Sequence, residues 1–148
     1  MKESEIKEQE LLQKGWIKAW VIFEVQAVSK DVVEEALKVH LGKIKSEKAL
    51  KVLEENAIEA KEVDAPEQLH PQGIKKLWSG LHEMIIFTKD VEALMNMVIN
   101  YGPSAIEILA PEKITLKMGE LQGALASVSD MMHKYAAAGV GGMLISGK

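Results

Sequence analysis

An unbroken alternation of side chains between residues 17 and 28 constrains the fold more than any other feature of this sequence. One face of the run is wholly apolar and consists of Ile17, Ala19, Val21, Phe23, Val25 and Ala27. Consecutive side chains of a β-strand point to opposite sides of the sheet, so the pattern predicts a strand with one face against a hydrophobic core. The chain therefore needs partner strands and a layer that covers them.

The residues after this strand predict a helix and then a second strand. Ser29 can cap a helix whose apolar residues recur three and four apart between Val32 and Ile44. Residues 49–63 suit either a helix or a long, irregular edge strand. We interpret them as a strand because the order of the surrounding elements requires one there.

The second half of the chain repeats the order strand, helix, strand. A loop over residues 64–73, rich in proline and glycine, joins the two halves. The three elements that follow it are predicted over residues 81–88, 90–101 and 104–109. Two strand-helix-strand units in succession are typical of the ferredoxin-like β-α-β-β-α-β plait, so we predict an α+β fold of this type.

The length of 148 residues is that of one domain with one core. The expected parts of this domain are an N-terminal helix over 1–15, the plait over 16–111, a region with a long C-terminal helix over 112–139 and a tail over 140–148. The apolar stripe of the long helix consists of Leu121, Leu125, Val128, Met132 and Tyr135. We expect this stripe to pack against the sheet.

The absence of cysteine excludes disulfides, thiolate nucleophiles and thiolate metal sites. No apolar run approaches the roughly 20 residues that a membrane helix needs. The first residues, Met1-Lys2-Glu3-Ser4-Glu5, also lack the order of a signal peptide, in which basic residues precede an apolar run. We therefore expect a cytoplasmic protein without a membrane partner.

The basic residues, 18 in number, are all lysines, and the formal net charge is −4. Lysine lacks the planar guanidinium group that binds phosphate or guanine through two hydrogen bonds. A net negative charge does not attract a nucleic-acid backbone, so binding to nucleic acid is disfavoured. A composition rich in lysine and glutamate and free of cysteine also follows the trend of thermophilic proteins.

The four histidines are the natural candidates for metal or acid-base chemistry, but none has the HxH, HExxH or HxxxH spacing of a metal site. Two of them have a carboxylate nearby: His82 precedes Glu83, and Asp130 lies one helical turn before His133. These four residues could form a metal or acid-base site if the last helix crossed the sheet there. Because such an Asp-His pair is more often a surface contact, we predict no metal and no cofactor, and we keep an enzyme built on these residues as the alternative.

Tryptophan and methionine side chains and an apolar cluster in the tail are the main candidates for an interface. Trp20 faces away from the apolar side of its strand, and the aromatic pairs of an RNA-binding plait are absent, so packing explains it better than base stacking. Methionine adapts to irregular surfaces, and an apolar cluster is costly to leave in water. The interface candidates are Trp16, Trp20, Trp78, Met131, Met143, Leu144 and Ile145.

Four stretches spread along most of the chain have a recognisable pattern. They are Gly15-Trp16-Ile17, Tyr101-Gly-Pro-Ser-Ala-Ile-Glu-Ile-Leu-Ala-Pro111, Gly119-Glu-Leu-Gln-Gly-Ala-Leu125 and Met132-His-Lys-Tyr135. In these stretches the sequence resembles a family of uncharacterised archaeal proteins. The resemblance implies a globular, cytoplasmic, archaeal protein, and it implies no activity because the motifs carry no chemistry of their own.

These features favour a non-enzymatic binding, regulatory or assembly module that self-associates. Exposed strand edges need covering, and contact between copies of a chain is one way to cover them. We expect a homo-oligomer. The enzyme based on a histidine-carboxylate cluster is the alternative, and an RNA-binding plait is the second alternative.

Overall fold

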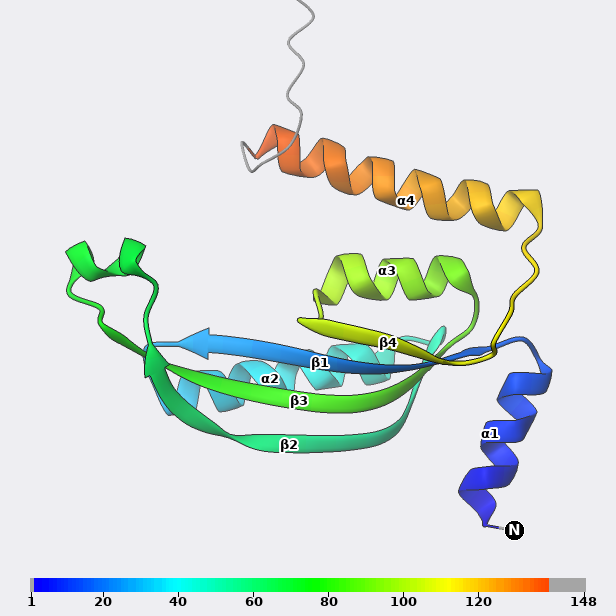
Figure 1. Ribbon diagram of the computed structural model, residues 1–148, viewed down its shortest axis with the longest axis horizontal. Helices are drawn as coiled ribbons and strands as arrows, with labels where there is room; N and C mark the ends of the chain where they lie inside the picture. The colour runs from blue at the N-terminus through cyan, green and yellow to red at the C-terminus, as the bar shows by residue number, and fades with distance from the viewer. Residues whose placement is uncertain (1, 139–148) are drawn as a thin grey trace, which may run out of the picture.

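The structure is a computed structural model that describes residues 2–138 (Figure 1). Its elements, in chain order, are α1 (Glu3–Gln13), β1 (Ile17–Ala27), α2 (Lys30–Ser46), β2 (Leu50–Asp64), the short 3-10 helix η1 (Glu67–Gln72), β3 (Lys76–Thr88), α3 (Val91–Tyr101), β4 (Ala105–Ala110) and α4 (Met118–Ala137). The predicted helices and strands are confirmed, including the strand interpretation of residues 49–63. None of the described helices is long and apolar enough to cross a bilayer.

The four strands form one antiparallel sheet in the order β2-β3-β1-β4. β1 and β3 are the central strands, and they pair from Ile17 opposite Thr88 to Ala27 opposite Trp78. β2 and β4 are the two edge strands. The fold is therefore α+β, with the predicted order of strands and helices along the chain.

β3 begins at Lys76, earlier than the residue 81 that the sequence predicted. Its first residues pair with the end of β2, where Asp64 lies opposite Lys76 and forms an ion pair with it. Ser79 and Gly80 interrupt the apolar pattern there, and glycine is depleted in strands, so propensity alone places the start of the strand too late in the sequence. Pairing with β2 outweighs that local preference.

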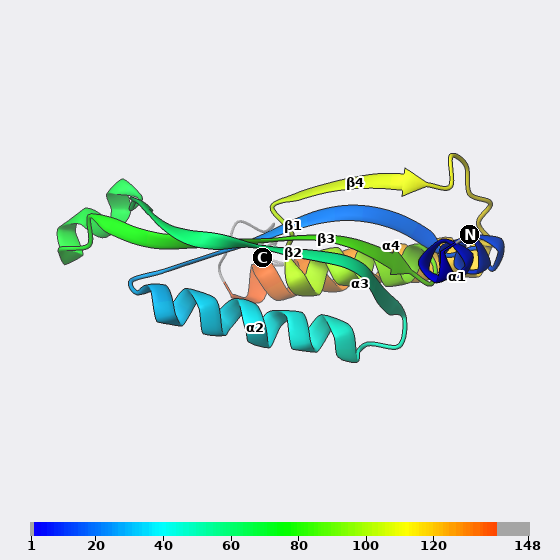
Figure 2. The same ribbon diagram turned by 90° about the horizontal axis from the view of Figure 1, so that it is seen from below.

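Helices α2 and α3 cover the same face of the sheet (Figure 2). The predicted apolar face of β1 is the core side: Val21 and Phe23 are fully buried beneath the helices. The main core cluster consists of Val21, Phe23, Ile44, Leu50, Met84, Ile86 and Met97. On the opposite face, side chains such as Trp20 and Ile85 are only half-buried, so this face is more open.

The sequence of α2 determines both the residue at which the helix begins and the face that it buries. The hydroxyl oxygen of Ser29 accepts a hydrogen bond from the backbone N–H of Val32 at 3.3 Å, which confirms the predicted N-cap. Val33, Leu37 and Ile44 are buried against the sheet. Their spacing of four and seven residues keeps them on one side of the helix.

Gly80 allows α2 to lie close to β3. A Cβ atom at this position would lie 2.5 Å from Cγ1 of Val33 and 2.8 Å from Cδ1 of Leu37. We therefore expect Gly80→Ala to lower the free energy of unfolding by about 1–3 kcal/mol, because both neighbours are buried and cannot move freely. Urea unfolding measures this change.

The matched control for this prediction is Gly42→Ala in α2, where an added Cβ would meet nothing within 4 Å. Alanine is the better helix former, so this variant should gain about 0.5–1 kcal/mol. A Gly80→Ala protein as stable as the control would contradict the close approach of helix and strand.

α1 lies beside the beginning of β1 (Figure 1). Its buried residue is Leu11, and Glu8 forms an ion pair with Lys18 of β1. The N–H of Trp16 donates a hydrogen bond to the carbonyl oxygen of Leu11 at 3.0 Å. These contacts attach the N-terminal helix to the sheet.

α4 packs mainly against α3, and the expectation that it packs against the sheet is wrong. Residues 111–117 form a connection without regular structure that carries the chain past the end of the sheet to the outer side of α3 (Figure 1). The contact with α3 uses small residues of α4. Ala124 is buried there, and a Cβ at Gly123 would lie 2.8 Å from a carboxylate oxygen of Glu92.

Candidate functional site

Most of the apolar stripe of α4 is exposed, because the contact with α3 is centred on an adjacent side of the helix, where Val128 is half-buried. Leu125 is 58% exposed, and Leu121, Met132 and Tyr135 are also exposed. The stripe has the spacing that normally marks a buried helix face. In the described part of the chain, this face has no partner of its own.

β4 adds a second group of exposed apolar side chains. It pairs with β1 on one side and forms an edge of the sheet on the other. Ile106 and Ile108 lie opposite the core residues Val21 and Ala19, yet they are 42% and 55% exposed. They are exposed because α3 packs on the two central strands instead of covering β4.

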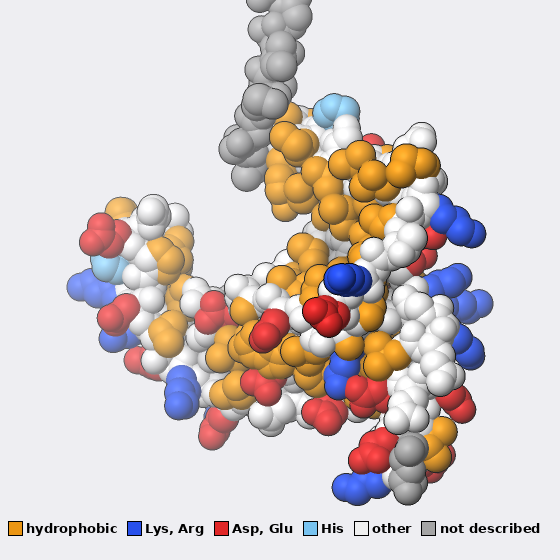
Figure 3. All heavy atoms as spheres, turned by 45° about the vertical axis from the view of Figure 1, so that its right-hand side comes forward, with side chains coloured by type: hydrophobic (Ala, Val, Ile, Leu, Met, Phe, Trp, Pro, Cys, Tyr) orange, Lys and Arg blue, Asp and Glu red, His pale blue; other side chains and the backbone are white. Residues whose placement is uncertain are grey.

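These side chains belong to a larger set of exposed apolar residues in the C-terminal third of the described chain. Figure 3 shows hydrophobic side chains gathered over α4 and below it. We call this set the C-terminal apolar surface; it consists of Val98, Ile106, Ile108, Leu109, Ile114, Met118, Leu121, Leu125, Met132 and Tyr135. Soluble monomers rarely expose contiguous apolar patches larger than a few hundred Å², so such a surface is typical of an interaction site.

The three predicted interface tryptophans lie in three different environments. Trp78 is half-buried on the helix side of the sheet, against the cluster that holds Val33 and Leu37. Trp20 is half-buried on the open face of the sheet. Trp16 precedes β1, and the Nζ of Lys51 lies 5.6 Å from the centre of its ring.

The remaining interface candidates lie at the C-terminal end. Met131 is half-buried and faces the seam between α3 and α4, so it is not part of the exposed stripe. Met143, Leu144 and Ile145 lie outside the described residues. Sequence reasoning missed the exposed residues of β4, and the signal that could have found them is the position of the fourth strand at a sheet edge.

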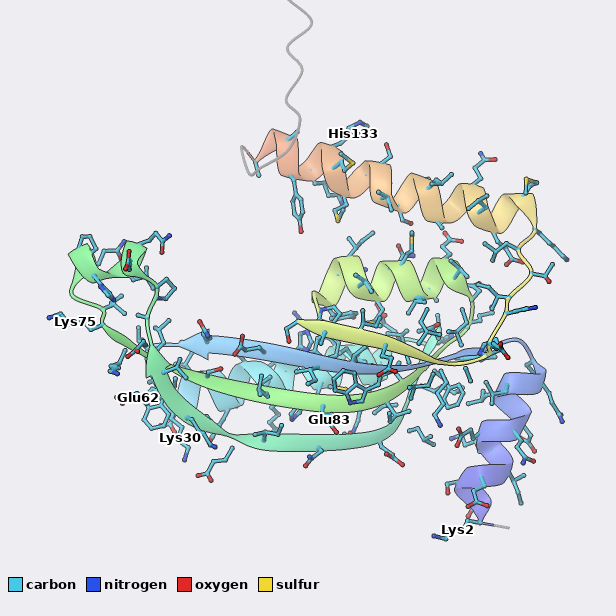
Figure 4. All side chains as sticks on the ribbon, in the orientation of Figure 1. Lys2, Lys30, Glu62, Lys75, Glu83 and His133 are labelled. Atoms are coloured by element: carbon cyan, nitrogen blue, oxygen red, sulfur yellow. The ribbon has the colours of Figure 1, made fainter. Side chains whose placement is uncertain are left out.

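His82, Glu83, Asp130 and His133 do not come together. Neighbouring strand residues point to opposite faces, so His82 lies under α2 whereas Glu83 lies on the open face. Asp130 and His133 belong to α4, which packs on α3, and Figure 4 shows His133 on the side of α4 that is turned away from the sheet. Within residues 2–138, no three histidine or acidic side chains are placed to hold a metal ion.

A different pair of histidines lies beside Phe23 on the helix side of the sheet. His40 of α2 makes an edge contact with Phe23, with ring centres 4.7 Å apart, and His82 stands opposite Phe23 in the pairing of β1 with β3. The Nε2–H of His40 donates to the carbonyl oxygen of Tyr101 at 3.2 Å. The Nδ1 atoms of both histidines are buried and lack a hydrogen-bond partner in the described part of the chain.

Burial lowers the pKa of both histidines. For His40 the loss of water is the largest cause, the backbone hydrogen bond opposes it, and Lys43 adds a smaller lowering. For His82 the loss of water again dominates the pKa change, Glu55 opposes it, and His40 and Lys45 lower it further. Both rings are therefore neutral at pH 7.

We expect the free energy of unfolding to fall as the pH drops below about 6.5. The unfolded chain binds protons on these histidines near that pH, whereas the folded chain binds them only at lower pH. The unfolded state then binds more protons, so stability rises with pH and is lost toward acid. Urea unfolding across this range measures the loss, and the double variant His40→Phe/His82→Phe should show a smaller one; an equal loss would assign the effect to other groups.

A model of the MJ0538 family matches residues 18–140, from the second residue of β1 to beyond the end of α4. No curated protein and no solved structure matches the chain. The description of the family names no activity.

Proposed function

The chain belongs to the MJ0538 family, and we propose that it is a non-enzymatic assembly module that self-associates through the C-terminal apolar surface. The observation that carries this proposal is the exposed stripe of α4, a 20-residue helix in which only Ala124 is buried. A broad apolar stripe along a helix normally packs in a protein interior or an interface. The charged residues of α4 are only Glu120, Asp130 and Lys134.

A second copy of the chain is the partner that we propose for this surface. In a twofold dimer the same patch of both subunits meets, so an apolar patch is complementary to itself without any matching of charges. A 20-residue helix is about 30 Å long and about 10 Å wide. The exposed apolar side chains of α3 and β4 extend this surface toward the roughly 800 Å² that each partner of a stable dimer buries.

We also propose that the fold is a ferredoxin-like plait. β1 and β2 run parallel with β3 between them, and β3 and β4 run parallel with β1 between them. Each of these pairs is joined by a helix, so the chain contains two split βαβ units. The exposed edge of β4 then needs covering, which supports contact with another copy.

The two alternative functions receive less support. An enzyme would need the histidines and carboxylates of one site to meet, and His82 and His133 lie on separate elements far from contact. RNA binding would need a basic sheet face, but the open face around Trp20 carries acidic side chains on every strand. These acidic residues are Glu24, Glu54, Glu83 and Glu107.

A cytoplasmic location and an archaeal, thermophilic source remain proposals. The cysteine-free composition supports a reducing compartment, and the lysine- and glutamate-rich, arginine-free sequence supports growth at high temperature. Neither property affects the argument for self-association.

Cysteine cross-linking tests the proposed interface, because the chain has no cysteine of its own. Leu125 lies near the middle of α4 on the apolar stripe and is 58% exposed, and Ala126 is the exposed residue beside it, about a quarter turn round the helix. If two α4 helices meet about a twofold axis, Leu125→Cys should form a disulfide-linked dimer under mild oxidation and Ala126→Cys should not. Equal amounts of covalent dimer from the two variants would contradict an interface formed by the stripe.

A further inference from the structure

A cavity of about 430 Å³ lies between α2 and β2. Residues 57–60 of β2 form one wall, and the pairing of β2 with β3 shifts register between Ile58 and Lys61. A bulge of this kind bends a strand away from its neighbour. Ligand pockets typically measure about 300–1,000 Å³, so this cavity has the size of a small-molecule site.

His82 lines the cavity from β3. Its side chain is 8% exposed, and its Nδ1 atom has no hydrogen-bond partner in the described part of the chain. Ala57 stands opposite His82 in the strand pairing and also lines the cavity, and its small side chain leaves space over the ring. Nδ1 is enclosed by protein and no other described residue hydrogen-bonds to Nε2, so Nε2 is the ring nitrogen through which a ligand in the cavity would pair with His82.

The rest of the lining defines the chemistry of a ligand. The apolar residues of the lining are Leu37, Leu41, Ala57, Ile58 and Ala60. Glu34, Lys38 and Glu59 add two carboxylates and one ammonium group, a balance that does not favour an anion. A hydroxyl both donates and accepts a hydrogen bond, so it can pair with a neutral imidazole in either tautomer.

We propose that this cavity binds a small, uncharged, mainly apolar molecule that carries one hydroxyl group, such as a phenol, and that His82 hydrogen-bonds to the hydroxyl. The lowered pKa of His82 keeps the ring neutral at pH 7, as this hydrogen bond requires. The cavity shares no residue with the C-terminal apolar surface. The site therefore stands whether or not the chain self-associates.

Titration of the full chain with p-cresol and with toluene tests the site, because the two probes differ by one hydroxyl group. NMR signals of isotopically labelled histidine rings report binding. We expect p-cresol to shift the ring signals of His82 and to bind about tenfold more tightly than toluene, the difference that one net hydrogen bond supplies. Equal affinity for the two probes, or unchanged His82 signals with p-cresol, would overturn the proposal.

Two variants sharpen the test. Ala57→Leu should fill the space over His82 and abolish binding of p-cresol, whereas Asn56→Leu, at the neighbouring position on the opposite face of β2, should leave it intact. Binding that persists in Ala57→Leu would overturn the assignment of the cavity. If Ala57→Leu fails to fold, His82→Phe serves instead: it keeps a ring of similar size, and it should bind p-cresol and toluene equally, while a retained preference for p-cresol would exclude His82 as the partner.

Discussion

Leu125→Lys combined with Met132→Lys is expected to convert the dimer that we propose into a monomer. Both side chains belong to the exposed stripe of α4, and neither lies in the contact with α3. In a twofold interface the two substitutions place four ammonium groups in an apolar contact, where a buried unpaired charge costs several kcal/mol. Size-exclusion chromatography with light scattering measures the change in mass.

The control places the same two charges on another side of the same helix. Ala126→Lys with His133→Lys adds lysines at exposed positions that are also seven residues apart and lie about a quarter turn round the helix from Leu125 and Met132. This variant should keep the mass of the unmodified protein. If both double variants remain associated, or if both dissociate equally, the stripe of α4 is not the interface.

Phe23→Ala is expected to lower the free energy of unfolding by about 3–5 kcal/mol, a large share of the roughly 5–15 kcal/mol of a typical domain. Phe23 is 2% exposed and lies in the main core cluster between the sheet and α2. Its ring contacts His40, whose ring contacts that of Tyr101 at the end of α3. Removal of the ring therefore leaves a cavity at the point where both helices meet the sheet.

Urea unfolding measures this loss, and Phe23→Leu is the matched control because it keeps most of the apolar volume. The leucine variant should cost much less than the alanine variant. A loss below about 1 kcal/mol for Phe23→Ala would contradict the position of Phe23 at the centre of the core.

The sequence predicted the central sheet well because its strongest patterns arise from burial. The alternation from Ile17 to Ala27 exists because one face of β1 meets the helices, and the stripe of α2 exists because Val33 and Leu37 face β3. Ser29 and Gly102 mark helix ends through backbone chemistry that needs no tertiary contact. Local rules therefore suffice for these elements.

The packing of α4 could not be predicted in the same way. Its stripe indicates that Leu121 and Leu125 require a partner, but spacing along a helix does not identify that partner. The small residues Gly123 and Ala124, on another side of the helix, make the contact with α3. The position of His40 and His82 beside Phe23 could not be predicted either, because it depends on where α2 crosses the sheet.

The candidate site differs from the predicted one for the same reason. His82 and Glu83 are adjacent in sequence yet lie on opposite faces, since a strand alternates its side chains. The exposure of Ile106 and Ile108 depends on α3 lying over the central strands instead of β4. The histidines and carboxylates singled out from the sequence therefore do not meet within the described residues. The contact between copies that we propose can instead be assigned to a specific set of exposed apolar residues.

Native mass spectrometry of the freshly purified, unmodified chain tests the central claim most directly, because it counts the subunits in one spectrum. Self-association through the C-terminal apolar surface predicts that the main species at micromolar concentration has twice the mass of the chain. A spectrum that contains only the single chain over the whole accessible concentration range would contradict the proposed function.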